Sequence, residues 1–133
     1  MDLGMPPLQW PPAPLKIQRG ASGKLEVRCL ARRKWVALEP EEWVRQHWLH
    51  YLSNDLGYPL SLTSLELPLD LNGQSQFADV VCHAPDGQAL LMVELKRPDV
   101  ALSKAVLDQL LRYHLEVRTP LLVISNGLHH QGY

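Results

Sequence analysis

Three apolar, strand-like stretches joined by two tight-turn signals constrain the fold of this chain more than any other feature. The stretches cover residues 60–67, 77–84 and 89–96, and the joins contain Asn72-Gly73 and Asp86-Gly87. Asn-Gly and Asp-Gly favour the left-handed backbone of hairpin turns, whereas β-branched and apolar residues favour strands. The sequence therefore predicts three consecutive antiparallel strands in one sheet.

Two helical patterns and a further strand surround this unit. A first helix begins near Pro40, carries apolar residues at helical spacing and ends before Gly57. A second helix covers residues 101–116, and residues 121–126, which begin with four apolar residues, follow as a buried strand. The order helix, three strands, helix, strand predicts an α/β (α+β) fold, a mixed sheet with helices packed on it.

The chain of 133 residues is long enough for one domain with a modest core. The prolines between residues 6 and 14 predict an extended N-terminal arm over residues 1–23, either laid over the domain or acting as a linker. The domain is expected to cover residues 24–133. At its start, residues 24–30 and 34–38 predict a short hairpin around a basic turn.

The net charge and the cysteine content argue against a strongly basic nucleic-acid-binding protein and against a secreted, disulfide-bonded one. The formal net charge of −1 gives no overall attraction to nucleic acid, so a DNA contact would depend on local basic clusters. One such cluster contains Arg28, Arg32, Arg33 and Lys34. If it does not contact DNA, these residues would form an ordinary solvated face. The two cysteines lie in apolar stretches, as is typical of reduced core thiols, and no segment is apolar enough to cross a membrane. The composition predicts a soluble, cytoplasmic protein.

Glu94 and Lys96 interrupt the third apolar stretch. They are two positions apart and therefore share a face of a strand. With a two-residue loop at the Asp-Gly turn, the hairpin places Asp79 directly opposite Glu94. A three-residue loop that begins at Pro85 and ends in a glycine bulge would instead place the two acids on opposite faces.

A tight turn at the Asn-Gly signal places a third acid, Glu66, opposite Asp79. The three acids would then form a row across neighbouring strands, with adjacent Cβ atoms about 4.5 to 5.5 Å apart. Such a row destabilises a sheet unless a cation lies between the carboxylates, and Mg²⁺, with Mn²⁺ as a substitute, accepts few carboxylates and keeps several waters. Lys96 would assist the attacking water and neutralise a pentacovalent phosphate, which predicts phosphodiester hydrolysis.

The pattern formed by Asp79 and Glu94-Leu95-Lys96 resembles the D…(D/E)-x-K signature of the PD-(D/E)xK nuclease superfamily. Gln109 and Tyr113, four positions apart on the second helix, look like the Q-x-x-x-Y motif of one branch of that superfamily. Residues 32–127 as a whole are similar to the N-terminal nuclease domain of type I restriction enzyme R subunits. The resemblance implies a restriction-endonuclease-like αβββαβ core.

The resemblance also implies roles for individual residues. Asp79 and Glu94 would be metal ligands and Lys96 the catalytic lysine, whereas Gln109 and Tyr113 would organise the site and its DNA contacts. Two residues remain alternatives for a fourth acid, namely Glu42 in the first helix and Glu66 in the following strand. The implied activity is that of a magnesium-dependent DNA endonuclease domain. Its partners would be DNA and a restriction-system subunit, a helicase or a dimer mate.

A second hypothesis belongs to another class of function. The same fold could serve as a non-catalytic DNA-binding or protein-interaction module, in which the acids only form ion pairs. The two hypotheses differ in whether divalent metal binds and in whether binding is lost in Asp79→Ala. Near the end of the chain, the adjacent His129 and His130 would point opposite ways in an extended segment, which favours a tail or loop over a metal site.

Overall fold

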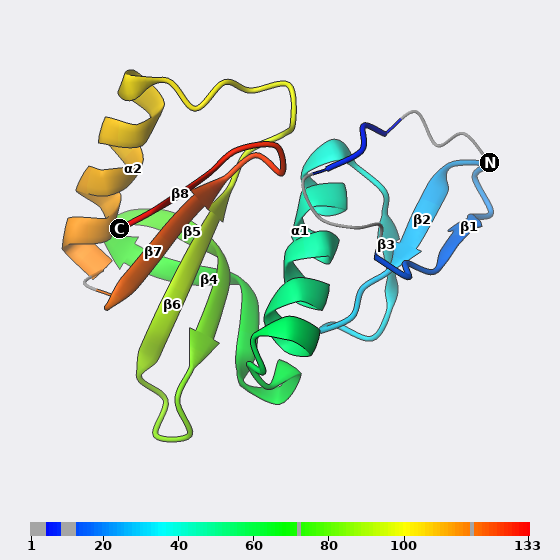
Figure 1. Ribbon diagram of the computed structural model, residues 1–133. Coiled ribbons are helices and arrows are strands. Elements are labelled where there is room, and N and C mark those ends of the chain that lie inside the picture. Colours follow the sequence, from blue (N-terminus) through cyan, green and yellow to red (C-terminus); the bar gives the residue numbers. More distant parts are fainter. Residues whose placement is uncertain (1–4, 9–12, 72, 118) are drawn as a thin grey trace.

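The computed structural model describes residues 5–8, 13–71, 73–117 and 119–133. The side chains of residues 70, 71, 74, 75 and 113–117 lie outside this description. Figure 1 shows two sheets, with the helix α1 (Pro40–His50) between them and the helix α2 (Lys104–Val117) beyond the larger sheet. Neither described helix is long and apolar enough to cross a membrane.

The larger sheet has five strands in the spatial order of the chain. They are β4 (Thr63–Leu71), β5 (Gln74–His83), β6 (Ala89–Leu95), β7 (Leu121–Ser125) and β8 (His130–Gly132). The strands β4, β5 and β6 pair antiparallel, and β6 pairs parallel to β7 because α2 carries the chain back between them. The predicted mixed α+β fold with its order of helices and strands is confirmed. The strand β8 was not predicted, because His129 and His130 were assigned to a tail or loop.

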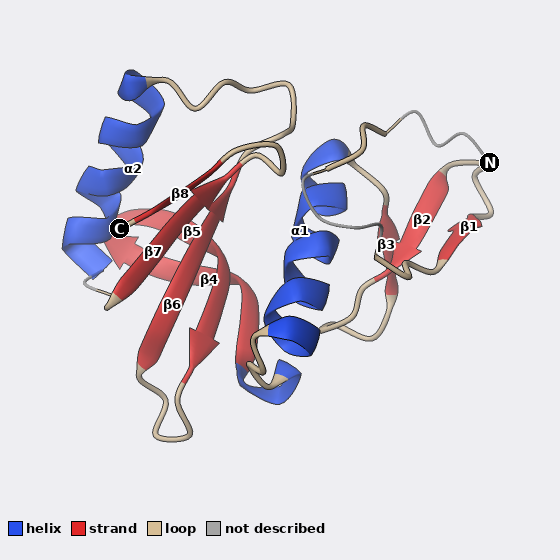
Figure 2. Cartoon of the chain, in the orientation of Figure 1, coloured by secondary structure: helices blue, strands red, loops and turns tan. Residues whose placement is uncertain are grey.

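The two helices cover opposite faces of this sheet (Figure 2). The face toward α1 is apolar through alternate residues of β5 and β6, such as Val80 and Val93, which pack with Val44, Leu49 and other residues of α1. The face toward α2 buries a second set that includes Val81 and Met92, against which leucines of α2 pack. Alternation along the strands thus feeds two separate cores.

The smaller sheet is an antiparallel meander of β1 (Ile17–Arg19), β2 (Leu25–Arg28) and β3 (Trp35–Ala37). The predicted hairpin of β2 and β3 is confirmed, with Val27 opposite Val36. The strand β1 falls within the residues that the sequence assigned to the N-terminal arm. Farther toward the N-terminus, the indole Nε1 of Trp43 donates a hydrogen bond of 3.0 Å to the carbonyl of Pro6, so this part of the arm lies against α1.

The helix α1 begins as the sequence predicts, with Pro40 in its first turn and Glu41 and Glu42 beside the positive end of its dipole. Its last turn widens into a π-helical segment, η1 (Tyr51–Asp55), before Gly57 turns the chain with a φ of 77°. A short 3₁₀ turn, η2 (Leu60–Leu62), then leads into β4. Residues 60–62, predicted as the start of that strand, therefore form a turn.

The β5–β6 hairpin combines both registers that the sequence left open. Near the turn, His83 pairs with Ala89, which is the register of the three-residue loop. A bulge at Leu90 then shifts the pairing, and Val80 lies opposite Val93 in the register of the two-residue loop. The bulge restores the arrangement that brings Asp79 next to Glu94.

Candidate functional site

Asp79 and Glu94 meet at the end of the β5–β6 pair, one position beyond Val80 and Val93. The Oδ2 atom of Asp79 accepts a hydrogen bond of 2.8 Å from the backbone N–H of Leu95, which fixes this carboxylate against β6. The side chain of Asp79 is 18% exposed, whereas Glu94 is 6% exposed. The predicted pair is therefore together, with one acid partly buried and the other buried.

Glu94 occupies an unfavourable electrostatic environment. Its pKa is raised to about 9, chiefly by burial and further by the negative charge of Asp79 and a hydrogen bond with that carboxylate, while the charge of Lys96 opposes the shift. The Oε1 atom of Glu94 is buried and has no hydrogen-bond partner among the described residues. An unpartnered buried carboxylate oxygen is costly, so Glu94 is a group that an added cation or proton would stabilise.

Lys96 follows directly on β6, and its backbone N–H continues the ladder to β7 by donating to the carbonyl of Ser125 at 2.8 Å. The side chain is partly exposed, and its positive charge acts on both Glu94 and Glu41. The sequence placed Glu94 and Lys96 at one site, and the structure brings them together with Asp79.

Glu41 is an acid of this site that the sequence analysis did not single out. Burial raises its pKa, the charge of Asp79 raises it further, and the charges of Arg45 and Lys96 act in the opposite direction. Its position in the first turn of α1 had a simpler explanation, a favourable interaction with the helix dipole. No sequence signal separates Glu41 from its neighbour Glu42, and in the structure Arg45 contacts both of them.

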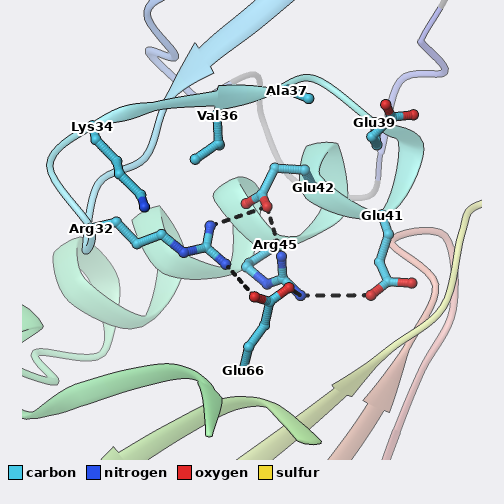
Figure 3. Close-up of a pocket in the computed structure, with 9 residues that line it drawn as sticks. All are labelled: Arg32, Lys34, Val36, Ala37, Glu39, Glu41, Glu42, Arg45 and Glu66. Carbon is cyan, nitrogen blue, oxygen red and sulfur yellow. Dashed lines mark hydrogen bonds and ion pairs between the residues drawn. The ribbon is translucent and has the colours of Figure 1, made fainter.

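Arg45 lies among the charged side chains beside these acids and contacts several of them (Figure 3). Its side chain is only 4% exposed, and its Nη1 lies 2.7 Å from Oε1 of Glu42. Its Nη2 lies 3.5 Å from Asp79, 3.6 Å from Glu41 and 3.8 Å from Glu66. The short contact is to Glu42, so Arg45 belongs chiefly to that acid and reaches Asp79 only weakly.

Glu42 is further satisfied by two other residues. Arg32, from the turn between β2 and β3, contacts the same Oε1 at 3.2 Å, and the Nε2 of Gln46 donates to Oε2 at 2.8 Å. The Oε1 of Gln46 accepts from the backbone N–H of Leu30 at 3.1 Å. Glu42 is thus saturated by partners from α1 and the small sheet, which we name the arginine cluster: Arg32, Glu42, Arg45, Gln46 and Glu66.

Glu66 belongs to this cluster through its side chain. Its neighbours keep the predicted register, with Leu65 opposite Val80 and Leu67 opposite Ala78. Glu66 itself has a φ of 51°, and its 58% exposed side chain contacts Arg32 at 3.4 Å. The predicted row of acids is therefore interrupted at β4, because the backbone turns this carboxylate toward the arginines.

A cavity of about 420 Å³ opens over the arginine cluster. It is lined by Arg32, Lys34, Val36, Ala37, Glu39, Glu41, Glu42, Arg45 and Glu66. Figure 3 shows the two guanidinium groups between the acids of α1 and Glu66. Glu41 and Arg45 line this cavity and also interact with Asp79, so the cavity adjoins the paired acids.

Of the two α2 residues in the predicted site, the structure describes the side chain of Gln109. Gln109 is exposed on α2, whose apolar residues pack on the opposite face of the sheet from α1. The side chain of Tyr113 lies outside the described residues. Of the predicted set, Asp79, Glu94 and Lys96 converge, and Glu42 and Glu66 belong to the neighbouring arginine cluster. Among the described residues, no hydrogen bond or ion pair links Gln109 to either group.

The donor set suits a particular kind of metal. Within the described part of the chain, no group of three or more His, Cys, Asp or Glu side chains is arranged to hold a metal ion. Two carboxylates, one of them with a free buried oxygen, are nevertheless enough for Mg²⁺, which retains several of its waters. They do not form the closed tetrahedral shell of a structural zinc site.

Comparison with known proteins gives one match. The family model described as the type I restriction enzyme R protein N terminus matches residues 40–133. This region begins at α1 and includes the five-stranded sheet, α2 and the acids of both groups, whereas the sheet of β1 to β3 precedes it. No curated protein and no solved structure matches the chain.

Proposed function

We propose that this chain, which belongs to the family of type I restriction enzyme R protein N termini, is a metal-dependent DNA endonuclease domain of the PD-(D/E)xK kind. The family places the chain in the context of restriction, with other subunits and DNA as partners. In this proposal Asp79 and Glu94 hold Mg²⁺ or Mn²⁺, Lys96 is the catalytic lysine, and Glu41 is the supporting helix carboxylate.

One observation carries the proposal. Glu94 is buried beside Asp79 with a pKa of about 9 and an oxygen that has no partner in the described part of the chain. An ionised Glu94 is therefore both desolvated and repelled by the charge of Asp79, which costs free energy. Perturbed acids of this kind are concentrated at functional sites, and a divalent cation would remove the penalty.

The residues of the chain divide the chemistry between them. A bound divalent ion would activate water and polarise a phosphoryl oxygen. The hydrogen bond from Leu95 fixes Asp79, so one ligand is oriented before anything binds. The positive charge of Lys96 acts on both Glu94 and Glu41. In this proposal its amine holds the attacking water and balances the negative charge that develops on phosphorus.

Arg45 does not prevent this arrangement. Its contact with Asp79 is long, at 3.5 Å, and its contact with Glu42 is short, at 2.7 Å. Because Arg45 stays paired with Glu42, the Oδ1 atom of Asp79 can give up its weak contact with Arg45 and coordinate a metal ion instead.

The second candidate function is a non-catalytic DNA-binding or protein-interaction module. The arginine cluster supports it, since Arg32 and Arg45 neutralise Glu42 and Glu66 without any metal. Under this hypothesis the buried Glu94 simply stays protonated.

Isothermal titration with Mn²⁺ separates the two functions. The endonuclease proposal expects binding in the wild type that is lost in Asp79→Asn and retained in Asp86→Asn, a matched change in the exposed β5–β6 turn. Plasmid nicking in Mg²⁺ should follow the same pattern. Metal binding that is equal in all three proteins, or absent from the wild type, would favour the non-catalytic module.

A further inference from the structure

A second pocket, on the small sheet, concentrates positive charge away from the acids. It has a volume of about 240 Å³ and is lined by Pro14, Lys16, Arg28, Cys29, Leu30, Arg33 and His50. This volume is several times the roughly 30 Å³ that one molecule occupies in liquid water, so the pocket has room for a hydrated anion. No acidic side chain is among these described lining residues.

The three cations of this pocket have no built-in counter-ion. Over the described ranges, neither Lys16, Arg28 nor Arg33 forms an ion pair with an acid, whereas Arg32 in the same turn pairs with Glu42 and Glu66. The basic cluster of the sequence is thus divided in two by the fold. Arg32 and Lys34 line the cavity over the chain's own acids, whereas Arg28 and Arg33 line this pocket and remain for a ligand.

The turn between β2 and β3 imposes this division. The backbone N–H of Cys29 donates to the carbonyl of Lys34 at 2.8 Å, and that of Arg33 donates to the carbonyl of Cys29 at 3.0 Å. The turn holds Arg33 at a φ of 57°, a conformation that costs a residue other than glycine about 1 kcal/mol or more. Adjacent residues Arg32 and Arg33 consequently line different pockets.

His50 adds a further polar group at the pocket. Its Nδ1 atom is buried and has no hydrogen-bond partner among the described residues. The ring lies in the last turn of α1, so the pocket joins the small sheet to the helix that also carries Glu41.

We infer that this pocket binds a phosphate group of the DNA backbone. The inference rests on the proposed function, because it names a contact for the same substrate. A chain with a net charge of −1 has no overall attraction to DNA, and its affinity must come from unpaired local cations. Phosphate is the group on DNA that arginine and lysine contact without regard to sequence.

The test measures binding without cleavage. A fluorescently labelled duplex is titrated in EDTA with Lys96→Ala protein, with and without the added changes Arg28→Gln and Arg33→Asn. Asn tolerates the left-handed backbone at position 33. We expect about tenfold weaker binding, and a plot of log affinity against log salt whose slope is smaller by about 2. The control, Lys104→Gln with Arg112→Gln, removes the same charge from α2 and should leave the slope nearly unchanged.

Three results would overturn the inference. Equal losses in the two double variants would mean general electrostatic attraction, and no loss in either would mean that the pocket does not contact DNA. Titration of the protein with inorganic phosphate, monitored by NMR, tests whether the pocket binds free phosphate instead of DNA. If phosphate binds but the duplex affinity of the Arg28 and Arg33 variant is unchanged, that result also counts against the inference. Arg33→Lys should retain affinity, which separates charge from backbone effects. Failure of the wild type to nick DNA would leave this binding result intact and would count only against the proposed function.

Discussion

Two groups of carboxylates lie side by side in this protein and are neutralised in opposite ways. In the arginine cluster, Glu42 contacts two guanidinium groups and the amide of Gln46. In the paired acids, Glu94 lies beside Asp79 with one oxygen unpartnered in the described structure, and the positive charge that acts on Glu94 is that of Lys96. The chain supplies two close guanidinium groups to Glu42. For the paired acids, the described structure shows a longer contact of 3.5 Å from Arg45 to Asp79 and the charge of Lys96, so Glu94 still requires a proton or an added cation.

This difference in neutralisation indicates which acids have a structural role and which are candidates for a functional one. A carboxylate with three partners is already at low energy and gains little from a metal ion. A carboxylate that is buried without enough partners gains much, and such groups are conspicuous exceptions in folded proteins. By this criterion Glu94 is the stronger candidate for chemistry, together with Asp79 and Glu41, whose charges act on it, and Glu42 is a structural residue.

The largest expected effect comes from removing the amine at the paired acids. Lys96→Ala should reduce plasmid nicking by about 10² to 10⁴-fold, because it removes the group that assists the attacking water. Mn²⁺ binding should persist in this variant, since both carboxylates remain. Lys104→Ala, which changes an exposed lysine of α2, is the control for loss of charge. Nicking at the wild-type rate in Lys96→Ala would separate this residue from the chemistry.

Removing the central cation of the arginine cluster should affect stability instead. Arg45→Met leaves buried Glu42 without its shortest ion pair, and we expect the free energy of unfolding to fall by about 3 to 5 kcal/mol. Urea denaturation measures this, with the exposed Arg112→Met as control. In the double variant Glu42→Gln, Arg45→Met, part of the loss should be recovered. A loss below about 1 kcal/mol in Arg45→Met would mean that Arg32 alone can neutralise the cluster.

The paired acids should give the stability of the protein a distinctive pH dependence. The pKa of Glu94 rises on folding from its ordinary value of 4.5 to about 9, so between these values the folded state binds more protons than the unfolded state. Stability should therefore fall as pH rises through this range, by on the order of a few kcal/mol in total. Thermal unfolding from pH 5 to pH 9 measures the trend.

Glu94→Gln provides the matched comparison for this pH dependence. The amide has the same shape and no charge, so its melting temperature should change less with pH and exceed that of the wild type near pH 8. Mg²⁺ should stabilise the wild type at pH 8 and leave Glu94→Gln nearly unaffected. Parallel pH profiles for the two proteins would contradict the raised pKa.

The strands and their register were largely predictable because local signals determined them. Asp86-Gly87 and Pro85 indicated two possible loops, and the structure uses the three-residue loop and then corrects the register with a bulge at Leu90. The bulge could not be predicted, because the exposed Leu90 is apolar like its neighbours in the strand and nothing in the sequence distinguishes it from them. The short strand β8 was missed for a related reason, since its three polar residues lack a strand pattern and pair only with β7.

The site was predictable in its strand residues and not in its helix residues. Asp79, Glu94 and Lys96 follow from strand pairing, which sequence spacing specifies. Which of Glu41 and Glu42 faces the paired acids depends on the rotation of α1 against the sheet, and tertiary packing alone sets that rotation. The role of Arg45 was hidden for the same reason.

The smallest expected effect lies at Glu66, the exposed member of the arginine cluster. Glu66→Gln removes two long ion pairs from a side chain that is 58% exposed, so the free energy of unfolding should change by no more than about 0.5 kcal/mol. Glu66→Gly removes the same charge and also relieves the backbone at a φ of 51°, so it should be at least as stable as Glu66→Gln despite its extra freedom in the unfolded state. Urea denaturation of the two variants compares these terms directly. A loss near that of Arg45→Met in Glu66→Gln would show that the exposed acid is as essential to the cluster as the buried one, and the contrast between the two groups of carboxylates would then rest on Glu94 alone.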